Sequence, residues 1–162
     1  MNVYINLPVE DLERSHAFFA ALGFTFNDDF SDAATLGMET GGTCRVMLVT
    51  HGRFATFTPR PLADARAATE VLVSLQLENR EAVDGFMDTA LAHGGDELQQ
   101  PQDYGFMYAR TLGDLDGHIW EPFWLDLEAA LEAGSPDEFG AGDEPGADGE
   151  PGADGEVRGE AP

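Results

Sequence analysis

One carboxylate in this sequence lies where an acid could do chemistry. The segment Leu112–Trp124 (LGDLDGHIWEPFW) contains Asp116–Gly117, a dipeptide typical of a tight hairpin turn, followed by an apolar strand. Because side chains alternate along a strand, Glu121 shares a face with the apolar residues two positions before and after it. If that face is buried, Glu121 needs a metal, a cation or hydrogen bonds. The alternative is an edge strand with Glu121 in water, which Pro122 favours because proline has no N–H.

Charge limits the partners that this chain can have. Its 162 residues include 31 acidic and 8 basic side chains, all eight of them arginine, for a net charge of -23. Such a surface repels nucleic acids and anionic membranes, so we expect neither as a partner. No apolar run reaches the ~20 residues of a membrane span, and the first residues do not resemble a signal peptide. The single Cys44 cannot form an internal disulfide. We therefore expect a cytoplasmic protein.

The first part of the chain predicts a strand, a helix and three further strands. Asp11 is a suitable N-cap for the helix and Gly23 ends it. The segment His51–Pro61 is expected to be irregular, and we favour a cover over one end of the fold rather than a mobile lid. The elements expected before it are Met1–Val9, a helix from Asp11 to Leu22, Phe24–Phe30, Ala33–Glu39 and Cys44–Thr50.

The pattern then begins again. Glu78 or Asn79 is expected to cap a second helix that ends at Gly94–Gly95, and residues 128–133 are expected to form a short terminal helix. Residues 134–162 repeat the sequence EPGADG and predict a disordered acidic tail, with a solubilising role favoured over a docking role. The strands expected in this half are Val71–Leu77, Glu97–Gln99, Gly105–Leu112 and the strand that carries Glu121.

An internal repeat relates the two halves. A shift of 68 residues places Asn6 on Ser74 and Asp11 on Asn79, and the last strands match with Met47 opposite Glu121. The sequence thus predicts two copies of β-α-β-β-β, at about residues 1–57 and 70–127, with a cavity between curled sheets.

Two segments of the chain resemble a known superfamily. LPVEDLERSHAFFAALGFTF and DLDGHIWEPFW resemble the opening and closing signatures of the vicinal oxygen chelate (VOC) superfamily, which includes glyoxalase I, fosfomycin- and bleomycin-resistance proteins and extradiol dioxygenases. The resemblance covers residues 1–127. It implies an α+β fold in which two tandem βαβββ modules form a curled mixed sheet around a cleft. It also implies, for many members, a divalent metal that chelates vicinal substrate oxygens, and often a homodimer.

The metal positions of that family are poorly filled here. Carried over residue by residue, they fall on Tyr4, Met47, Leu72 and Glu121. Leucine has no lone pair, methionine is a soft ligand, and a neutral phenol binds metals weakly, so a single carboxylate remains. A catalytic metal usually has three protein ligands. We therefore expect no metal cofactor, with a divalent metal as the lesser alternative.

What remains is the expected lining of a small-molecule pocket. Fixed hydrogen-bonding groups and aromatic area together suit a small organic ligand. Glu121 could act as an acid or base, or could instead form a structural ion pair with Arg110. The expected pocket residues are Tyr4, Asn6, Met47, Ser74, Gln76, Tyr104, Phe106, Tyr108 and Arg110, with Glu121 as the candidate catalytic residue.

Three functions are compatible with this lining. The first is a VOC-type protein that binds a small molecule without metal. The second is a glyoxalase-like lyase, isomerase or dioxygenase acting on a small oxygenated metabolite, which would depend on a metal or on Glu121. The third is a fold reused for protein association. The sequence leaves open whether the protein is an enzyme.

Overall fold

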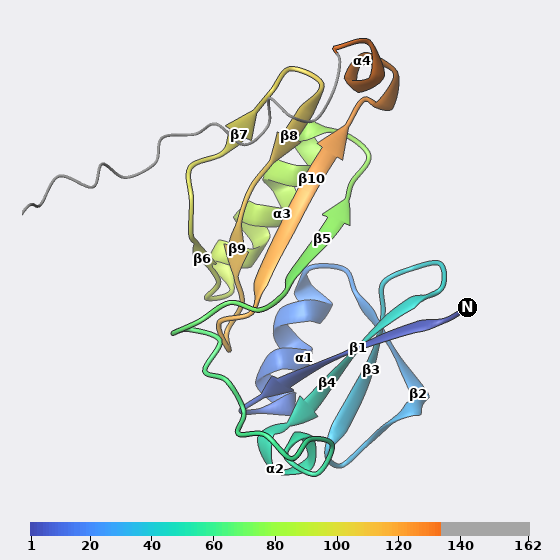
Figure 1. Ribbon diagram of the computed structural model, residues 1–162, viewed down its shortest axis with the longest axis vertical. Helices are drawn as coiled ribbons and strands as arrows, with labels where there is room; N and C mark the ends of the chain where they lie inside the picture. Colours follow the sequence, from blue (N-terminus) through green and yellow to red (C-terminus); the bar gives the residue numbers. More distant parts are fainter. Residues whose placement is uncertain (134–162) are drawn as a thin grey trace, which may run out of the picture.

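The computed structural model describes residues 1–133. The predicted acidic tail, residues 134–162, lies outside the described residues. Figure 1 shows two βαβββ units, each with its own sheet and one helix against it. The α+β class and the tandem modules predicted from the repeat are confirmed, and the hydrogen-bonded strands form two separate sheets.

The first unit is a four-stranded mixed sheet in the order β1-β4-β3-β2, with β1 parallel to β4. Its helix begins where the sequence predicts, because the Asp11 side chain accepts a hydrogen bond from the Arg14 amide at 3.0 Å. Gly23 follows the helix with φ of 91° and allows the chain to turn back. The elements are β1 (Val3–Val9), α1 (Leu12–Ala21), β2 (Thr25–Asp32), β3 (Thr35–Glu39) and β4 (Cys44–Thr50).

The second unit repeats this order with shorter outer strands. Asn79, rather than Glu78, caps the helix and accepts from the Ala82 amide at 2.8 Å. The elements are β5 (Leu72–Gln76), α3 (Arg80–Ala92), β6 (Asp96–Glu97), β7 (Gln102–Asp103), β8 (Met107–Ala109), β9 (Leu112–Gly113) and β10 (Ile119–Leu125). Two short helices complete the described chain: α2 (His51–Phe54), at the start of the segment expected to be irregular, and α4 (Leu127–Glu132).

The strand that carries Glu121 is central rather than an edge strand. β10 pairs with β5 on one side and with β8 and β9 on the other. The Arg110 amide donates to the Pro122 carbonyl at 3.1 Å, but Pro122 has no N–H to return that bond. This missing bond explains why the single strand expected over Gly105–Leu112 is observed as two pieces, β8 and β9. The alternative in which Glu121 lies on an edge strand, which Pro122 favoured, was therefore wrong.

The two units share one hydrophobic core. The Trp120 ring lies 5.0 Å from the Phe19 ring, and Phe24 contacts Phe86 at 6.3 Å between centroids. These contacts join α1 and its following loop to α3 and β10. Trp120, Phe18 and Phe19 are almost fully buried, and burial of such large side chains is the main stabilising contribution.

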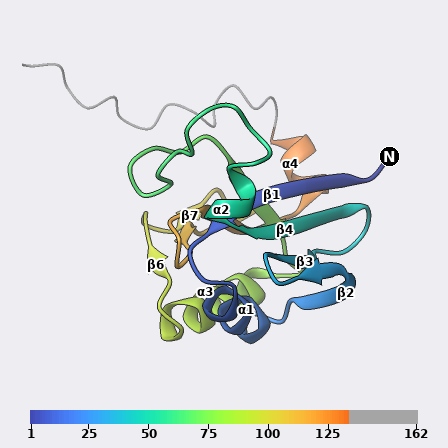
Figure 2. The ribbon, with the colours of Figure 1, turned by 90° about the horizontal axis from the view of Figure 1, so that it is seen from below.

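The two longer helices, α1 and α3, lie on the opposite side of the molecule from the loop that joins the two units. Figure 2 shows α1 and α3 next to each other on one side of the sheets, with α2 and the loop that follows it on the other. We call the faces turned away from α1 and α3 the open faces of the two sheets. No helix within residues 1–133 is long and apolar enough to cross a membrane.

Candidate functional site

Five of the expected pocket residues and the candidate catalytic residue, Glu121, lie on the open faces. In the first sheet, Asn6 pairs with Met47 and Tyr4 lies two positions before Asn6 on the same side. In the second sheet, Ser74 pairs with Glu121 and Gln76 with Phe123. The strand pairing agrees with the repeat, since the residues that the repeat makes equivalent form the equivalent pairs Asn6–Met47 and Ser74–Glu121.

Glu121 is half-buried and accepts one hydrogen bond from a neighbouring strand. The Ser74 hydroxyl donates to its Oε2 atom at 2.9 Å. The expected alternative, an ion pair between Glu121 and Arg110, was wrong. The Arg110 guanidinium instead contacts Asp84 at 3.0 Å and Glu97 at 2.9 Å.

Tyr108 and Arg110 lie on the opposite face from Glu121. The Tyr108 hydroxyl donates to the Asp84 carboxylate of α3 at 2.8 Å, and burial together with this carboxylate raises the pKa of Tyr108. Tyr108 pairs with Trp124, so both side chains face the helix. Tyr108 and Arg110 therefore help to hold α3 on the sheet and do not line a pocket on the open face.

The remaining expected residues do not form one pocket. Asn6 and Met47 line a cavity of about 470 Å³ on the first sheet. Ser74 and Gln76 line another, of about 440 Å³, beside β5. Tyr104 and Phe106 lie in the loop between β7 and β8, and line none of the cavities described for residues 1–133. Within one chain, the two halves of the expected pocket are therefore separate.

The metal positions implied by the resemblance do not make a metal site. The chemistry of Tyr4, Met47, Leu72 and Glu121 offers one good ligand for a hard divalent ion. Within residues 1–133, no group of three or more histidine, cysteine or acidic side chains is placed to hold a metal. One of the Glu121 carboxylate oxygens already accepts a hydrogen bond from the Ser74 hydroxyl. The donor set therefore does not fit a VOC metal.

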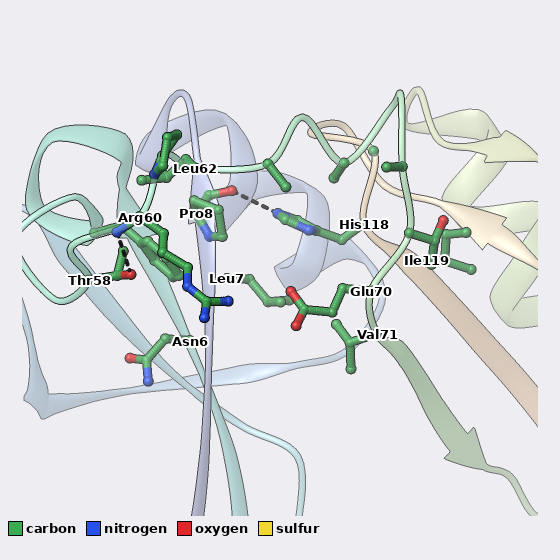
Figure 3. Close-up of a pocket in the computed structure, with 17 residues that line it drawn as sticks. Asn6, Leu7, Pro8, Thr58, Arg60, Leu62, Glu70, Val71, His118 and Ile119 are labelled. Atoms are coloured by element: carbon green, nitrogen blue, oxygen red, sulfur yellow. Dashed lines mark hydrogen bonds between the residues drawn. The ribbon is translucent and has the colours of Figure 1, made fainter.

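The largest described cavity lies elsewhere, under the loop that joins the two units. It measures about 530 Å³. Figure 3 shows β1 at one wall, residues 58–71 at two others and the start of β10 at the fourth. Its apolar lining includes Leu7, Pro8, Leu62, Val71 and Ile119, and its polar lining includes Asn6, Thr58, Arg60, Thr69, Glu70 and His118.

His118 joins this cavity to a buried polar network. Its Nε2 atom lies 2.7 Å from the carbonyl oxygen of Pro8, and the residue is 8% exposed. Its backbone amide donates to Asp114, which also accepts from Trp120 Nε1 at 2.9 Å. Burial raises the pKa of Asp114, although the hydrogen bonds oppose this shift. His118 is thus held rigidly at the cavity wall.

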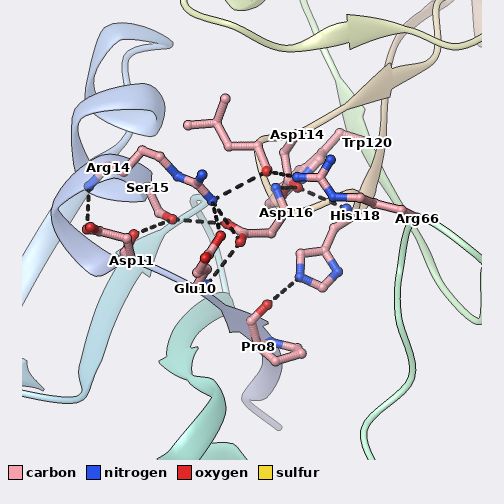
Figure 4. A network of polar contacts seen from close by, with 11 residues as sticks. Pro8, Glu10, Asp11, Arg14, Ser15, Arg66, Asp114, Asp116, His118 and Trp120 are labelled. Atoms are coloured by element: carbon pink, nitrogen blue, oxygen red, sulfur yellow. Dashed lines mark hydrogen bonds and ion pairs between the residues drawn. The ribbon is translucent and has the colours of Figure 1, made fainter.

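The same hairpin is anchored to the first unit. Figure 4 shows the Asp116 carboxylate against the start of α1. It accepts from the Glu10 amide at 2.9 Å and from the Arg14 guanidinium at 2.9 Å. The Arg66 guanidinium donates to the Leu115 carbonyl of this turn, so the loop above the cavity is fixed to the hairpin too.

Sequence reasoning did not find this cavity. Its loop residues, among them Arg60 and Glu70, lie in a segment without hydrophobic periodicity. Arg60 carries the one available signal, because a cation is uncommon in a chain of net charge -23.

One family model and several solved structures are similar to this chain. The family model described as bleomycin resistance protein-like N-terminal matches residues 2–41. A hypothetical protein, SA1046 from S. aureus, is 30% identical, with a TM-score of 0.66, 76% of this chain covered and 91% of that chain. A comparison with curated proteins found no match.

Two further structures share the fold at lower identity. A glyoxalase/bleomycin resistance protein/dioxygenase family enzyme from Burkholderia phytofirmans PsJN is 18% identical, with a TM-score of 0.64 and coverage of 76% of this chain and 97% of that chain. A bleomycin resistance determinant encoded on the transposon Tn5 is 21% identical, with a TM-score of 0.53 and coverage of 76% and 96%. With its tandem βαβββ units and the signatures at Leu7–Phe26 and Asp114–Trp124, the chain belongs to the vicinal oxygen chelate superfamily.

Proposed function

We propose that this protein binds a small organic molecule without a metal, in the cavity under the loop of residues 58–71. The observation that carries the proposal is the cavity itself. Its volume, about 530 Å³, is in the range of small-molecule sites, and its walls are mostly apolar with a few polar groups. The similarity to a bleomycin resistance determinant supports a role in binding a small molecule.

The walls of this cavity are fixed from both sides, which favours binding. Asp116 ties the hairpin to α1, His118 is hydrogen-bonded to Pro8, and Arg66 holds the loop to Leu115. A preformed site loses less conformational entropy when its ligand binds. The cavity therefore has the rigidity that a binding site needs.

A catalytic role for Glu121 is the second candidate. One specific contact favours it: the half-buried carboxylate is oriented by the Ser74 hydroxyl on an open face. The relative from Burkholderia phytofirmans is described as an enzyme. In this alternative, Glu121 would act as an acid or base on a small oxygenated metabolite.

We further propose that the protein is a cytoplasmic homodimer. Exposed apolar side chains on the open faces support an association, with Tyr4 43% and Leu72 50% exposed. Each lies on an outer strand, since β1 pairs with β4 alone and β5 with β10 alone within residues 1–133. A second copy of the chain could cover these faces. Sedimentation at several protein concentrations tests this, and a monomer throughout would contradict it.

Binding in the cavity can be tested with an uncharged fluorescent probe. Nile red should bind the full-length protein, with its emission increased and shifted to the blue. Ala68→Trp places a bulky ring in the cavity wall and should weaken binding at least about tenfold. Ala67→Trp is the matched control, because Ala67 is exposed, adjacent in sequence and not part of the lining. Equal affinities of the two variants for Nile red would contradict the proposed site.

A further inference from the structure

Two opposite charges face each other across the cavity under the loop of residues 58–71. Figure 3 shows the guanidinium of Arg60 and the carboxylate of Glu70 directed toward one another, with Leu7 on the wall between them. No ion pair joins Arg60 to Glu70. The space between the two charged groups is therefore open to a ligand.

Arg60 is unusual among the arginines of this chain. Within residues 1–133, each of the other arginine side chains contacts a carboxylate or a backbone carbonyl. The Arg60 side chain has no such partner there, and only its backbone amide bonds, to Thr58. In a protein with 31 acidic residues, a guanidinium that contacts no carboxylate among residues 1–133 stands out. It offers five N–H donors to an acidic group from outside.

Glu70 offers the complementary group. Its carboxylate has no hydrogen bond or ion pair to any residue in the described part of the chain. An ion pair between two exposed side chains contributes little to stability, so the absence of an Arg60–Glu70 pair costs the folded protein little. An ammonium group of a ligand would form an ion pair with Glu70, and an acidic group of the ligand would form one with Arg60.

The net charge of the protein narrows the ligand class further. A free anion is repelled by a surface of net charge -23, whereas a molecule with one acidic and one basic group is neutral overall. The apolar wall residues Leu62, Val71 and Ile119 leave room for an uncharged body. From these observations we infer that the ligand of this cavity is a zwitterion with an apolar body, its acidic group on Arg60 and its ammonium group on Glu70.

This inference rests on the proposed binding site, and three probes with one fluorophore test it. ε-Dansyl-lysine carries both charged groups, dansyl-glycine only the carboxylate, and dansyl-cadaverine only the ammonium. Titrated into the full-length protein, ε-dansyl-lysine should bind about tenfold more tightly than either of the others. Equal affinities for the three probes would overturn the inference.

Variants in which one charged side chain is replaced by glutamine test which ligand group each side chain binds. Arg60→Gln should weaken ε-dansyl-lysine and dansyl-glycine about fivefold and leave dansyl-cadaverine unchanged. Glu70→Gln should weaken ε-dansyl-lysine and dansyl-cadaverine about fivefold and leave dansyl-glycine unchanged. Arg60→Lys keeps the charge and should restore most of the affinity. Glu128→Gln removes one exposed acid from α4 and should change nothing, which controls for net charge.

The outcomes separate this inference from the proposed function. If Ala68→Trp abolishes Nile red binding while the dansyl probes show no charge preference, the binding site stands and the zwitterion inference fails. If neither Nile red nor any dansyl probe binds, both fail. Loss of charge preference in Arg60→Gln and Glu70→Gln, with wild-type melting temperatures, supports the inference.

Discussion

The Asp116 carboxylate accepts a hydrogen bond from the Glu10 backbone amide at 2.9 Å, although the two residues lie 106 positions apart. The Asp116 side chain is 8% exposed and also contacts the Arg14 guanidinium and the Ser15 hydroxyl. The carboxylate from the turn of the second unit therefore takes the place of water as a hydrogen-bond acceptor at the N-terminus of α1. Unpaired amides and the helix dipole favour a negative charge there. One side chain thus joins the two halves of the repeat.

Asp116→Ala should cost about 2 kcal/mol of unfolding free energy, because it leaves the Glu10 amide and the Arg14 guanidinium without this partner. Urea denaturation followed by tryptophan fluorescence measures the change. Asp88→Ala is the control, since Asp88 is an exposed residue of α3 and should change the unfolding free energy by less than about 0.5 kcal/mol. If the two variants are equally stable, the hairpin does not hold the units together.

The Arg80–Asp103 pair predicts a stability change at low pH. The hydrogen bonds from Arg80 lower the pKa of Asp103 from 3.8 to about 2. A carboxyl group with a lowered pKa in the folded state stabilises the protein above its unfolded pKa, and this contribution disappears as the pH falls. The wild type should therefore be more stable than Asp103→Asn above pH 4, and the two should converge near pH 2.

Urea titrations of both proteins between pH 2 and pH 7 test this. In an Arg80→Gln background, Asp103→Asn should have a much smaller effect at every pH, because the favourable partner is gone. A constant difference between wild type and Asp103→Asn across the pH range would show that the pair does not set this pKa.

Glu121→Gln should leave the unfolding free energy within about 1 kcal/mol of the wild type. Its one described partner is the Ser74 hydroxyl, at 2.9 Å, and the glutamine oxygen can still accept that bond. If Glu121 is catalytic, the same variant loses turnover while it keeps its fold. Thermal and urea denaturation give the stability. A loss above about 2 kcal/mol would instead assign Glu121 a structural role.

Removal of metal should not affect the protein. The family metal positions Tyr4, Met47, Leu72 and Glu121 supply one hard ligand, which is too few for tight binding. Dialysis against a chelator should change the melting temperature by less than about 1 °C, and added Zn²⁺, Ni²⁺, Mn²⁺ or Fe²⁺ should not raise it. Elemental analysis of untagged protein is the direct measurement. One bound divalent ion per chain would overturn this assignment and favour the enzyme alternative.

Local pattern in the sequence was sufficient for the helices α1 and α3 and for most of the strands. The helix starts follow from Asp11 and Asn79, whose side chains cap the backbone three residues further on. The equivalence of the two halves follows from the repeat, and the pairs Asn6–Met47 and Ser74–Glu121 agree with it. Signals of this kind depend on neighbours in the chain, so they can be read without a structure.

Contacts between distant segments decided the rest. Arg110 could pair with any nearby acid, and only the packing of α3 on the sheet brings it to Asp84 rather than Glu121. Pro122 favoured an edge strand, yet β10 is central because strands from both sides pair with it at the cost of one hydrogen bond. Likewise, Arg60 and Glu70 face each other only because the loop folds over β1. Periodicity and spacing carry no information on such contacts, since these depend on how the two units pack in three dimensions.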